Sequence, residues 1–522
     1  MSQMNTKKLI TFAGLLPVVL VAALLFTFPA HAAVPGITGP SFSLSAGESF
    51  ISQPDGSMVY SWGYGCSTGP SGFVPAAISG GTCPSMQIPG PTLIVHVNDT
   101  VVVTLTNNLP AAAGNTSILF PGFQVTTGGG VAGLLTQEAQ HGSSVTYTFT
   151  ATTPGTRSYY SGTQGDLQIE MGLYGAIVVL PNNVPSGCRP LASNLPDGQP
   201  DFRLAASAYD HAAACYDREY LFQFSEMDPA IHSQAQVQVA ARVGCVAGAV
   251  GCSLNVATEP YRPAYFMING RSMPDDMDPN YAFEYPHQPY NGNPHMHPGE
   301  QVLLRVIGQG RWQHPFHEHG NHVRILGRDV NIILSQTDPT NNLAGPLLFT
   351  TTTTPGQAFD GIFYWTAKGL NWDAYGHNPA SADPLAKLPC VADANGYNTG
   401  APTALNYFEW CQDHNKPMQT APFGDLAGGG PVTLPDPNLF ANGAWYGGSP
   451  YLGPNATVRA TGPTGTTPPS GTIANSPTGE AGFAFMWHSH NEREITTNNI
   501  FPGGMLMMML VDSREFVIDE SN

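Results

Sequence analysis

The chain has 522 residues, a formal net charge of −18 at pH 7, and charged side chains at only 11% of its positions. Binding to nucleic acid or to an anionic membrane surface relies on clustered cations, so this acidic balance argues against both partners. The 58 glycines and 47 prolines predict a chain that is rich in turns and poor in surface helices.

The amino terminus carries the pattern of a signal peptide. Lys7 and Lys8 precede an apolar stretch over residues 9–28, and small residues follow at Ala30 and Ala32. An apolar stretch of this length could also stay in place as a membrane anchor, but the two alanines favour cleavage after the first 32 residues. That segment contains two lysines and no acidic residue, so the mature chain would carry a formal charge of −20. We therefore expect an exported protein, either periplasmic, at the cell surface or extracellular.

Strand patterns follow along the mature chain. Apolar residues alternate with polar ones, or form short runs between turn signals, over residues 93–97, 101–105, 145–149, 218–227 and 301–306. Asn269-Gly270 lies between two apolar runs, as expected of a hairpin turn. Short strands with this punctuation predict β-sandwiches or barrels, and the sequence has no long amphipathic helix pattern. The expected fold class is all-β.

The mature chain is too long for one sandwich, so we expect two domains. A boundary is predicted after the apolar run over residues 175–180, which gives a first domain at 33–182 and a second at 183–522. The second would carry a long loop-rich insertion at about residues 367–480, where the composition is typical of segments without regular structure.

Eight cysteines remain after the predicted cleavage, and in an exported protein an even number of cysteines suggests disulfides. Several pairings remain open, since eight cysteines can connect in many ways. None of the eight lies beside a histidine, so a thiolate metal ligand is not expected. Pairs that are close in sequence are the simplest choice: Cys66 with Cys83, Cys188 with Cys215, Cys245 with Cys252, and Cys390 with Cys411.

Histidines form the most specific pattern. The segment HPFHEHGNH begins at His314, and HSH begins at His488. Side chains two positions apart on a strand point to the same face, so His317 and His319 would project together. The same holds for His488 and His490. Two such strands side by side would bring four imidazoles to one point, which suits copper or zinc and is rarely needed for packing.

Two further groups of residues, a second histidine pair and three glutamates, are expected to lie in contact with solvent. His295-Met296-His297 precedes Pro298-Gly299-Glu300, and we expect a turn exposed to solvent there. The carboxylates of Glu318, Glu492 and Glu494 could supply metal ligands or move protons. As acidic side chains they are expected to be solvated charges.

Several longer stretches resemble the multicopper oxidase family, whose members are built of cupredoxin domains. In the first predicted domain the resemblance rests on residues 89–92, 98–100, 107–110, 153–156 and 172–175. In the second it rests on the more specific motifs at residues 268–271, 314–320, 488–490 and 504–505. It implies two cupredoxin-like Greek-key β-sandwich domains. The chain is most similar to the two-domain members, which assemble as homotrimers.

The resemblance also implies ligand roles. In the family, the first histidine of the HPFH segment and a cysteine of the last motif hold a type 1 copper, which takes electrons from the substrate. The other histidines, with four from the first domain, hold a trinuclear copper cluster that reduces oxygen to water. By position, His314 matches a type 1 ligand and His317 a type 2 ligand. The type 3 ligands are matched by His319, His488 and His490.

The chain departs from the family pattern at most copper positions. The four histidines of the first domain are replaced by Leu119, Pro121, Tyr160 and Gly162. Ser489 stands where the type 1 cysteine is expected, and a hard serine hydroxyl cannot replace the soft thiolate that a blue copper site needs.

The remaining type 1 positions differ too. Glu494 stands at the second type 1 histidine, and the inserted residues 496–503 displace the methionine position, although Met505 could still approach. Together, His314, Ser489 and Glu494 could hold a harder ion.

Three functions remain open, and whether the protein is an enzyme is undecided. The preferred one is an exported copper-binding protein with a histidine-only centre and fewer than four copper ions. It could act as a non-standard oxidoreductase on oxygen and a small-molecule electron donor. The second is a catalytically inactive extracellular scaffold or binding protein, although retention of the five second-domain histidines weighs against it. The third is an oxidase whose missing ligands come from another chain.

Overall fold

The computed structural model describes residues 34–75, 78, 82–183, 185, 188, 206–338, 340, 342–368, 388–400, 408–412, 448–450, 482–512 and 518. The predicted signal peptide and most of the predicted insertion at about 367–480 lie outside these residues. Within them, no helix is long and apolar enough to cross a membrane.

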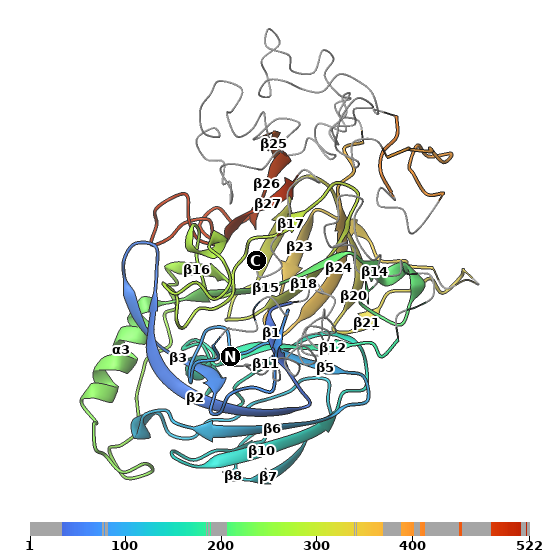
Figure 1. Ribbon diagram of the computed structural model, residues 1–522. Helices are drawn as coiled ribbons and strands as arrows, with labels where there is room; N and C mark the ends of the chain where they lie inside the picture. Colours follow the sequence, from blue (N-terminus) through green and yellow to red (C-terminus); the bar gives the residue numbers. More distant parts are fainter. Residues whose placement is uncertain are drawn as a thin grey trace, which may run out of the picture.

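Residues 36–180 form a β-sandwich in the lower part of Figure 1. One sheet contains, in order, β11 (Gly155–Tyr160), β12 (Tyr174–Leu180), β5 (Leu93–His96), β1 (Gly36–Thr38) and β4 (Phe73–Val74). The other contains, in order, β3 (Met58–Cys66), β2 (Ser41–Ser52), β6 (Thr100–Asn107), β10 (Ser144–Thr150) and β7 (Thr126–Gly129). Short elements complete this part: η2 (Ala111–Ala113), β8 (Val131–Ala132), β9 (Gln137–Glu138) and α2 (Gly165–Gln168).

Alternating side chains account for the strands of this sandwich. Along β6 every second residue is buried, beginning with Val101, while threonines occupy most of the positions between. Along β10 the same alternation buries Val145, Tyr147 and Phe149 against the same core. Burying one face of each sheet against the other removes this apolar surface from water, which is the main stabilising term. The strands predicted at 93–97, 101–105 and 145–149 are therefore confirmed.

Later residues form a second sandwich. One sheet contains, in order, β16 (Tyr265–Ile268), β15 (Arg218–Met227), β18 (Gln301–Gly308), β24 (Ala358–Tyr364), β20 (Val323–Arg328) and β21 (Asn331–Ile332), with β22 (Leu347–Leu348) also on β20. The other contains, in order, β17 (His295–Met296), β27 (Leu506–Asp512), β26 (Gly482–Ser489), β19 (His314–Glu318) and β23 (Thr350–Thr353), with β25 (Gly448–Pro450) also on β26. Outside these sheets lie β13 (Ala206–Ser207), η3 (Ala212–Ala214), β14 (Cys215–Tyr216) and η4 (Asp275–Met277).

The two sandwiches confirm the all-β prediction. The strands predicted at 218–227 and 301–306 are β15 and β18. Asn269 and Gly270 both have positive φ, and they form the turn that brings Ile268 opposite Arg271. The exact domain boundary at residue 182 stays a prediction.

One helix was not anticipated. It is α3 (Pro229–Ala240), and it begins where the side chain of Asp228 accepts a hydrogen bond from the backbone N–H of Ala230. Its buried residues Ile231 and Ala235 belong to the core of the first sandwich, although they follow β15 of the second. A segment of the predicted second domain therefore packs into the first core (Figure 1).

Buried polar groups join the two sandwiches. Arg305 of β18 donates to Glu219 of β15 at 2.7 Å and to the hydroxyl of Thr156 of β11 at 3.1 Å. The Thr156 hydroxyl in turn donates to Asp360 of β24 at 2.6 Å. Because these groups are buried, the network requires the two sandwiches to dock in one orientation.

All four sequence-local disulfides are present. Each pair joins Cα atoms about 5.5 Å apart, which is the ordinary span of a disulfide: Cys66–Cys83, Cys188–Cys215, Cys245–Cys252 and Cys390–Cys411.

Candidate metal centre

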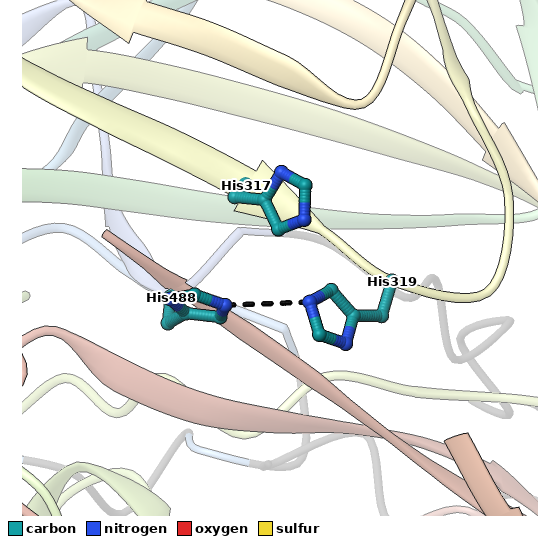
Figure 2. A group of neighbouring side chains, drawn as sticks. All are labelled: His317, His319 and His488. Atoms are coloured by element: carbon teal, nitrogen blue, oxygen red, sulfur yellow. Dashed lines mark hydrogen bonds between the residues drawn. The ribbon is translucent and has the colours of Figure 1, made fainter. Parts of the chain in front are cut away.

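The two histidine motifs lie on neighbouring antiparallel strands. In the register of β19 against β26, His317 stands directly opposite His488. Directly opposed residues of an antiparallel pair project from the same face of the sheet, so their rings meet. His319 follows immediately after β19 and turns toward the same point (Figure 2). The convergence predicted from the HxH spacing is therefore found for these three residues.

The three imidazoles form a compact group. One ring nitrogen from each of His317, His319 and His488 lies within 4.8 Å of the other two. The Nε2 atoms of His319 and His488 are 3.3 Å apart, and Figure 2 draws this contact as a dashed line. His317 and His488 are buried and His319 is half-buried. Imidazole nitrogens at this spacing are a donor set that suits copper or zinc.

His490 lies beside this group at the surface. Its ring centroid is 4.8 Å from that of His317 and 5.6 Å from that of His488, and the residue is exposed. Its backbone N–H donates to the carbonyl of Pro315 at 2.8 Å, which ties the end of β26 to β19. His490 therefore stands on the solvent side of the three-histidine group.

Two of the rings at the centre have lowered pKa values. Burial, together with the neighbouring histidines His319, His488 and His490, lowers the pKa of His317 to about 3. Burial also lowers the pKa of His488. A neutral imidazole keeps one lone pair free, which is the form that binds a metal ion. The donor set therefore fits a copper ion near neutral pH.

His314 has a different environment. It is fully buried, and its Nδ1 and Nε2 are each 2.9 Å from a carboxylate oxygen, that of Glu494 and that of Glu226 respectively. Burial alone would lower the pKa of His314, but hydrogen bonds and charges of the two carboxylates outweigh it and raise the pKa to about 9. Near neutral pH this residue is an imidazolium, and both of its nitrogens are engaged.

Comparison with known proteins finds a similarity in the first part of the chain. Residues 83–184 match the family model described as multicopper oxidase. Laccase abr2 of Aspergillus fumigatus is 36% identical over 98 residues, which span 18% of this chain and 16% of that protein. This part of the chain is therefore similar to multicopper oxidases, and the alignment spans about a sixth of the laccase's own length.

Solved structures of multicopper oxidases also align with most of the chain. Multicopper oxidase mgLAC is 14% identical, with a TM-score of 0.44 over 93% of this chain and 88% of that one. The blue copper oxidase of Nitrosomonas europaea is 14% identical, with a TM-score of 0.43 over 90% of this chain and 85% of that one.

Other groups pack the four first-sandwich positions at which the resemblance implies histidines. The backbones of Leu119 and Tyr160 hydrogen-bond to each other, and the Leu119 side chain fills the space beside Gly162. A Cβ atom at Gly162 would lie 2.8 Å from the Leu119 side chain, which leaves no room for an imidazole there. Pro121 is half-buried on the same segment. These four positions offer no imidazole ligand.

Ser489, at the position where the resemblance implies a cysteine, also has a hydrogen-bond partner. Its buried hydroxyl donates to Oε2 of Glu494, the same oxygen that accepts from His314. The side-chain amide of Asn491 donates to Oε1 of Glu494 at 2.9 Å. The side chains around Ser489 thus satisfy each other, and His314 lies between two glutamates.

Two predictions about exposure are wrong. His295 and His297 are buried, because β17 pairs with β27 and brings His295 within 2.5 Å of Asp512, far away in sequence. Glu494 and Glu318 are also buried, whereas Glu492 is exposed as expected.

Glu318 differs from Glu494 in its surroundings. Its carboxylate has no hydrogen-bond partner among the described residues, and burial raises its pKa well above the usual value. Glu318 is therefore buried, and its protonated form is favoured more than that of a solvated carboxyl group.

Sequence reasoning missed two residues that shape this region, Glu226 and Thr350. Glu226 lies near the end of β15, and no motif marks it. Thr350 begins a run of five threonines and stands opposite His317 in the pairing of β19 with β23. The only available signal was the strand pattern of the threonine run.

Proposed function

We propose that this chain is an exported copper-binding protein with one metal centre held by His317, His319 and His488, with His490 as a fourth ligand. It would act, if it turns over, as a non-standard oxidoreductase. The observation that supports this proposal is the group of three imidazoles with nitrogens within 4.8 Å of one another. Copper bound there would supply one-electron oxidation and reduction.

The proposal gives each residue a definite role. His317 and His488 would hold the ion from the two paired strands, and His319 would close the third side. The exposed His490 would leave the solvent side adjustable, which suits a centre that must admit oxygen or a small electron donor. His314 stays outside the proposed ligand set, because both of its nitrogens are hydrogen-bonded to carboxylates.

The usual four-copper activity is not part of this proposal. The positions of the first-sandwich ligands are occupied by Leu119, Pro121, Tyr160 and Gly162, and no thiol stands at residue 489. Fewer than four copper ions are therefore expected. Export is supported by the four disulfides, which persist in oxidising compartments. A homotrimer, as in two-domain relatives, is carried over from the resemblance alone.

The test is metal content together with spectroscopy. Purified protein reconstituted with copper is expected to bind about one ion per chain, because one group of histidines is available. Its spectrum should have no intense blue absorbance band, and its electron paramagnetic resonance signal should be that of nitrogen-ligated Cu(II). The variant His488→Ala should lose the ion. The matched control His322→Ala changes a histidine of the same segment and should retain it.

Two outcomes would contradict the proposal. A folded protein that binds no copper would support the scaffold function. About three or more copper ions per chain would support an oxidase completed by ligands from another chain. If copper binds as proposed, consumption of oxygen with a small-molecule reductant would then decide whether the protein is an enzyme.

A further inference from the structure

The side chain of Thr350 contacts the back of a ring in the proposed centre. Its hydroxyl oxygen lies 2.5 Å from Nδ1 of His317. The contact follows from the strand register, since Thr350 at the start of β23 stands directly opposite His317 of β19. Thr350 is therefore held beside one ring nitrogen by the backbone pairing of the sheet.

The partner of Nδ1 determines what Nε2 can do. A neutral imidazole carries one proton, and the nitrogen without it holds the lone pair. A group that accepts a hydrogen bond from Nδ1 keeps the proton there and leaves Nε2 free to bind a metal ion. A group that donates to Nδ1 would place the proton on Nε2 instead.

His488 shows the arrangement from the opposite strand. Its Nδ1 is 2.6 Å from the backbone carbonyl of Ser489. A carbonyl can only accept, so Nδ1 of His488 carries the proton and Nε2 carries the lone pair. That Nε2 is the atom that lies 3.3 Å from Nε2 of His319 (Figure 2). The ring nitrogens that converge from His319 and His488 are therefore of the Nε2 type.

We propose that Thr350 is a positioning residue of the metal centre: its hydroxyl oxygen accepts the Nδ1–H of His317 and holds the Nε2 lone pair toward His319 and His488. This role rests on the proposed copper centre. The two directly opposed rings would then each have a hydrogen-bond acceptor at Nδ1, a backbone carbonyl for His488 and the Thr350 hydroxyl for His317. The His317 ring also forms a hydrogen bond with the backbone of Phe349. Of these groups, only the hydroxyl can be removed by substitution.

If Thr350 served only packing, a substitution that keeps its shape would leave the metal centre unchanged. Valine has nearly the shape of threonine and favours strands, so packing and pairing of β23 would be preserved in Thr350→Val. The hydrogen bond to Nδ1 would be lost. Serine restores the hydroxyl without the methyl group. Thr352 lies on the same strand, is exposed and pairs with Pro315, so Thr352→Val is the matched control.

The first measurement uses the metal-free protein. Long-range proton–nitrogen correlation spectra of histidine rings distinguish the Nδ1–H tautomer from the Nε2–H tautomer. His317 is expected in the Nδ1–H form in the wild type, in Thr350→Ser and in Thr352→Val. In Thr350→Val it should be a mixture of both forms. A His317 ring in the Nε2–H form in the wild type would overturn the proposal.

The second measurement uses copper. In competition titrations, Thr350→Val should bind Cu(II) about 10- to 100-fold more weakly than the wild type, as is typical when a hydrogen bond behind a metal-binding histidine is removed. Its paramagnetic resonance parameters should change, and Thr350→Ser should restore most of the affinity. Matching thermal unfolding midpoints in all variants would exclude a general loss of structure.

The outcomes separate this role from the proposed function. Wild-type copper binding with an undiminished affinity in Thr350→Val would overturn the role of Thr350 alone. Absence of copper binding in the wild type would overturn both the metal centre and this role.

Discussion

His314 is a buried cation held between two anions. The energetic cost of removing its charge from water is offset by short contacts to Glu226 and Glu494, each at 2.9 Å. Removing only the cation would leave two carboxylates in the interior without their partner. His314 should therefore matter for stability even though it is outside the proposed ligand set.

The variant His314→Gln is expected to be less stable below neutral pH. The pKa of His314 rises from 6.5 in the unfolded chain to about 9 in the fold, so its stabilising contribution is complete below pH 6.5 and is lost as pH rises through 9. A shift of this size corresponds to about 3 kcal/mol in the free energy of unfolding. Urea unfolding at pH 6 measures the difference in the free energy of unfolding between wild type and variant. This difference should narrow as the pH is raised toward 10.

A matched change at the exposed His96 provides the control. His96→Gln should leave the free energy of unfolding within about 0.5 kcal/mol of the wild type. If His314→Gln lowered the free energy of unfolding equally at pH 6 and pH 10, hydrogen-bond geometry, and not the charge, would stabilise this position.

Individual residues differed in how well the sequence predicted them. The grouping of His317, His319 and His488 followed from side-chain alternation, which is a local property. The partners of His295 and His314 did not, because Asp512 and Glu226 are more than 80 positions away in sequence and reach them only through strand pairing. A single sequence contains no information about such pairs apart from a known family pattern.

At the scale of elements, strands with clear alternation were predictable and α3 was not. Residues 229–240 include Gln, Ser and Val, which give no apolar stripe of helical spacing. The helix is fixed instead by its ends and its packing. Asp228 accepts from Ala230 at 2.9 Å and from Arg262 at 2.7 Å, which caps the helix and ties it to the following loop.

Removing this cap should destabilise the protein. Asp228→Ala is expected to lower the free energy of unfolding by about 1–2 kcal/mol, because two backbone donors lose their acceptor. Asp228→Asn keeps one acceptor oxygen and should lose less. Chemical denaturation compares these variants with Glu492→Ala, which changes an exposed carboxylate. If Asp228→Ala left the free energy of unfolding unchanged, packing alone would hold α3 in place.

At the scale of the whole molecule, the contact between sandwiches depends on buried polar groups contributed by both. Arg305 connects Glu219 on its own side with Thr156 across the contact. The fold class was predictable because each strand has its own pattern. The docking was not, since no local pattern indicates which sheet faces will meet.

The variant Arg305→Met is expected to weaken this contact. Removing the cation leaves the carboxylates of Glu219 and Asp360 buried without it, which should lower the free energy of unfolding by about 3–5 kcal/mol. Denaturant unfolding measures this effect, and the variant Arg262→Met, at an exposed arginine, is the control. A loss below about 1 kcal/mol would indicate that the two sandwiches dock mainly through apolar contacts.

The arrangement around Glu494 would hinder the introduction of a thiolate copper site at this place. Returning a cysteine to position 489 would restore one ligand, but the neighbouring histidine would still carry a proton and both of its nitrogens would still be committed to glutamates. The space for a cation is already filled by a charge that belongs to the chain itself. A single substitution at position 489 would therefore meet an interior whose polar groups are already paired with one another.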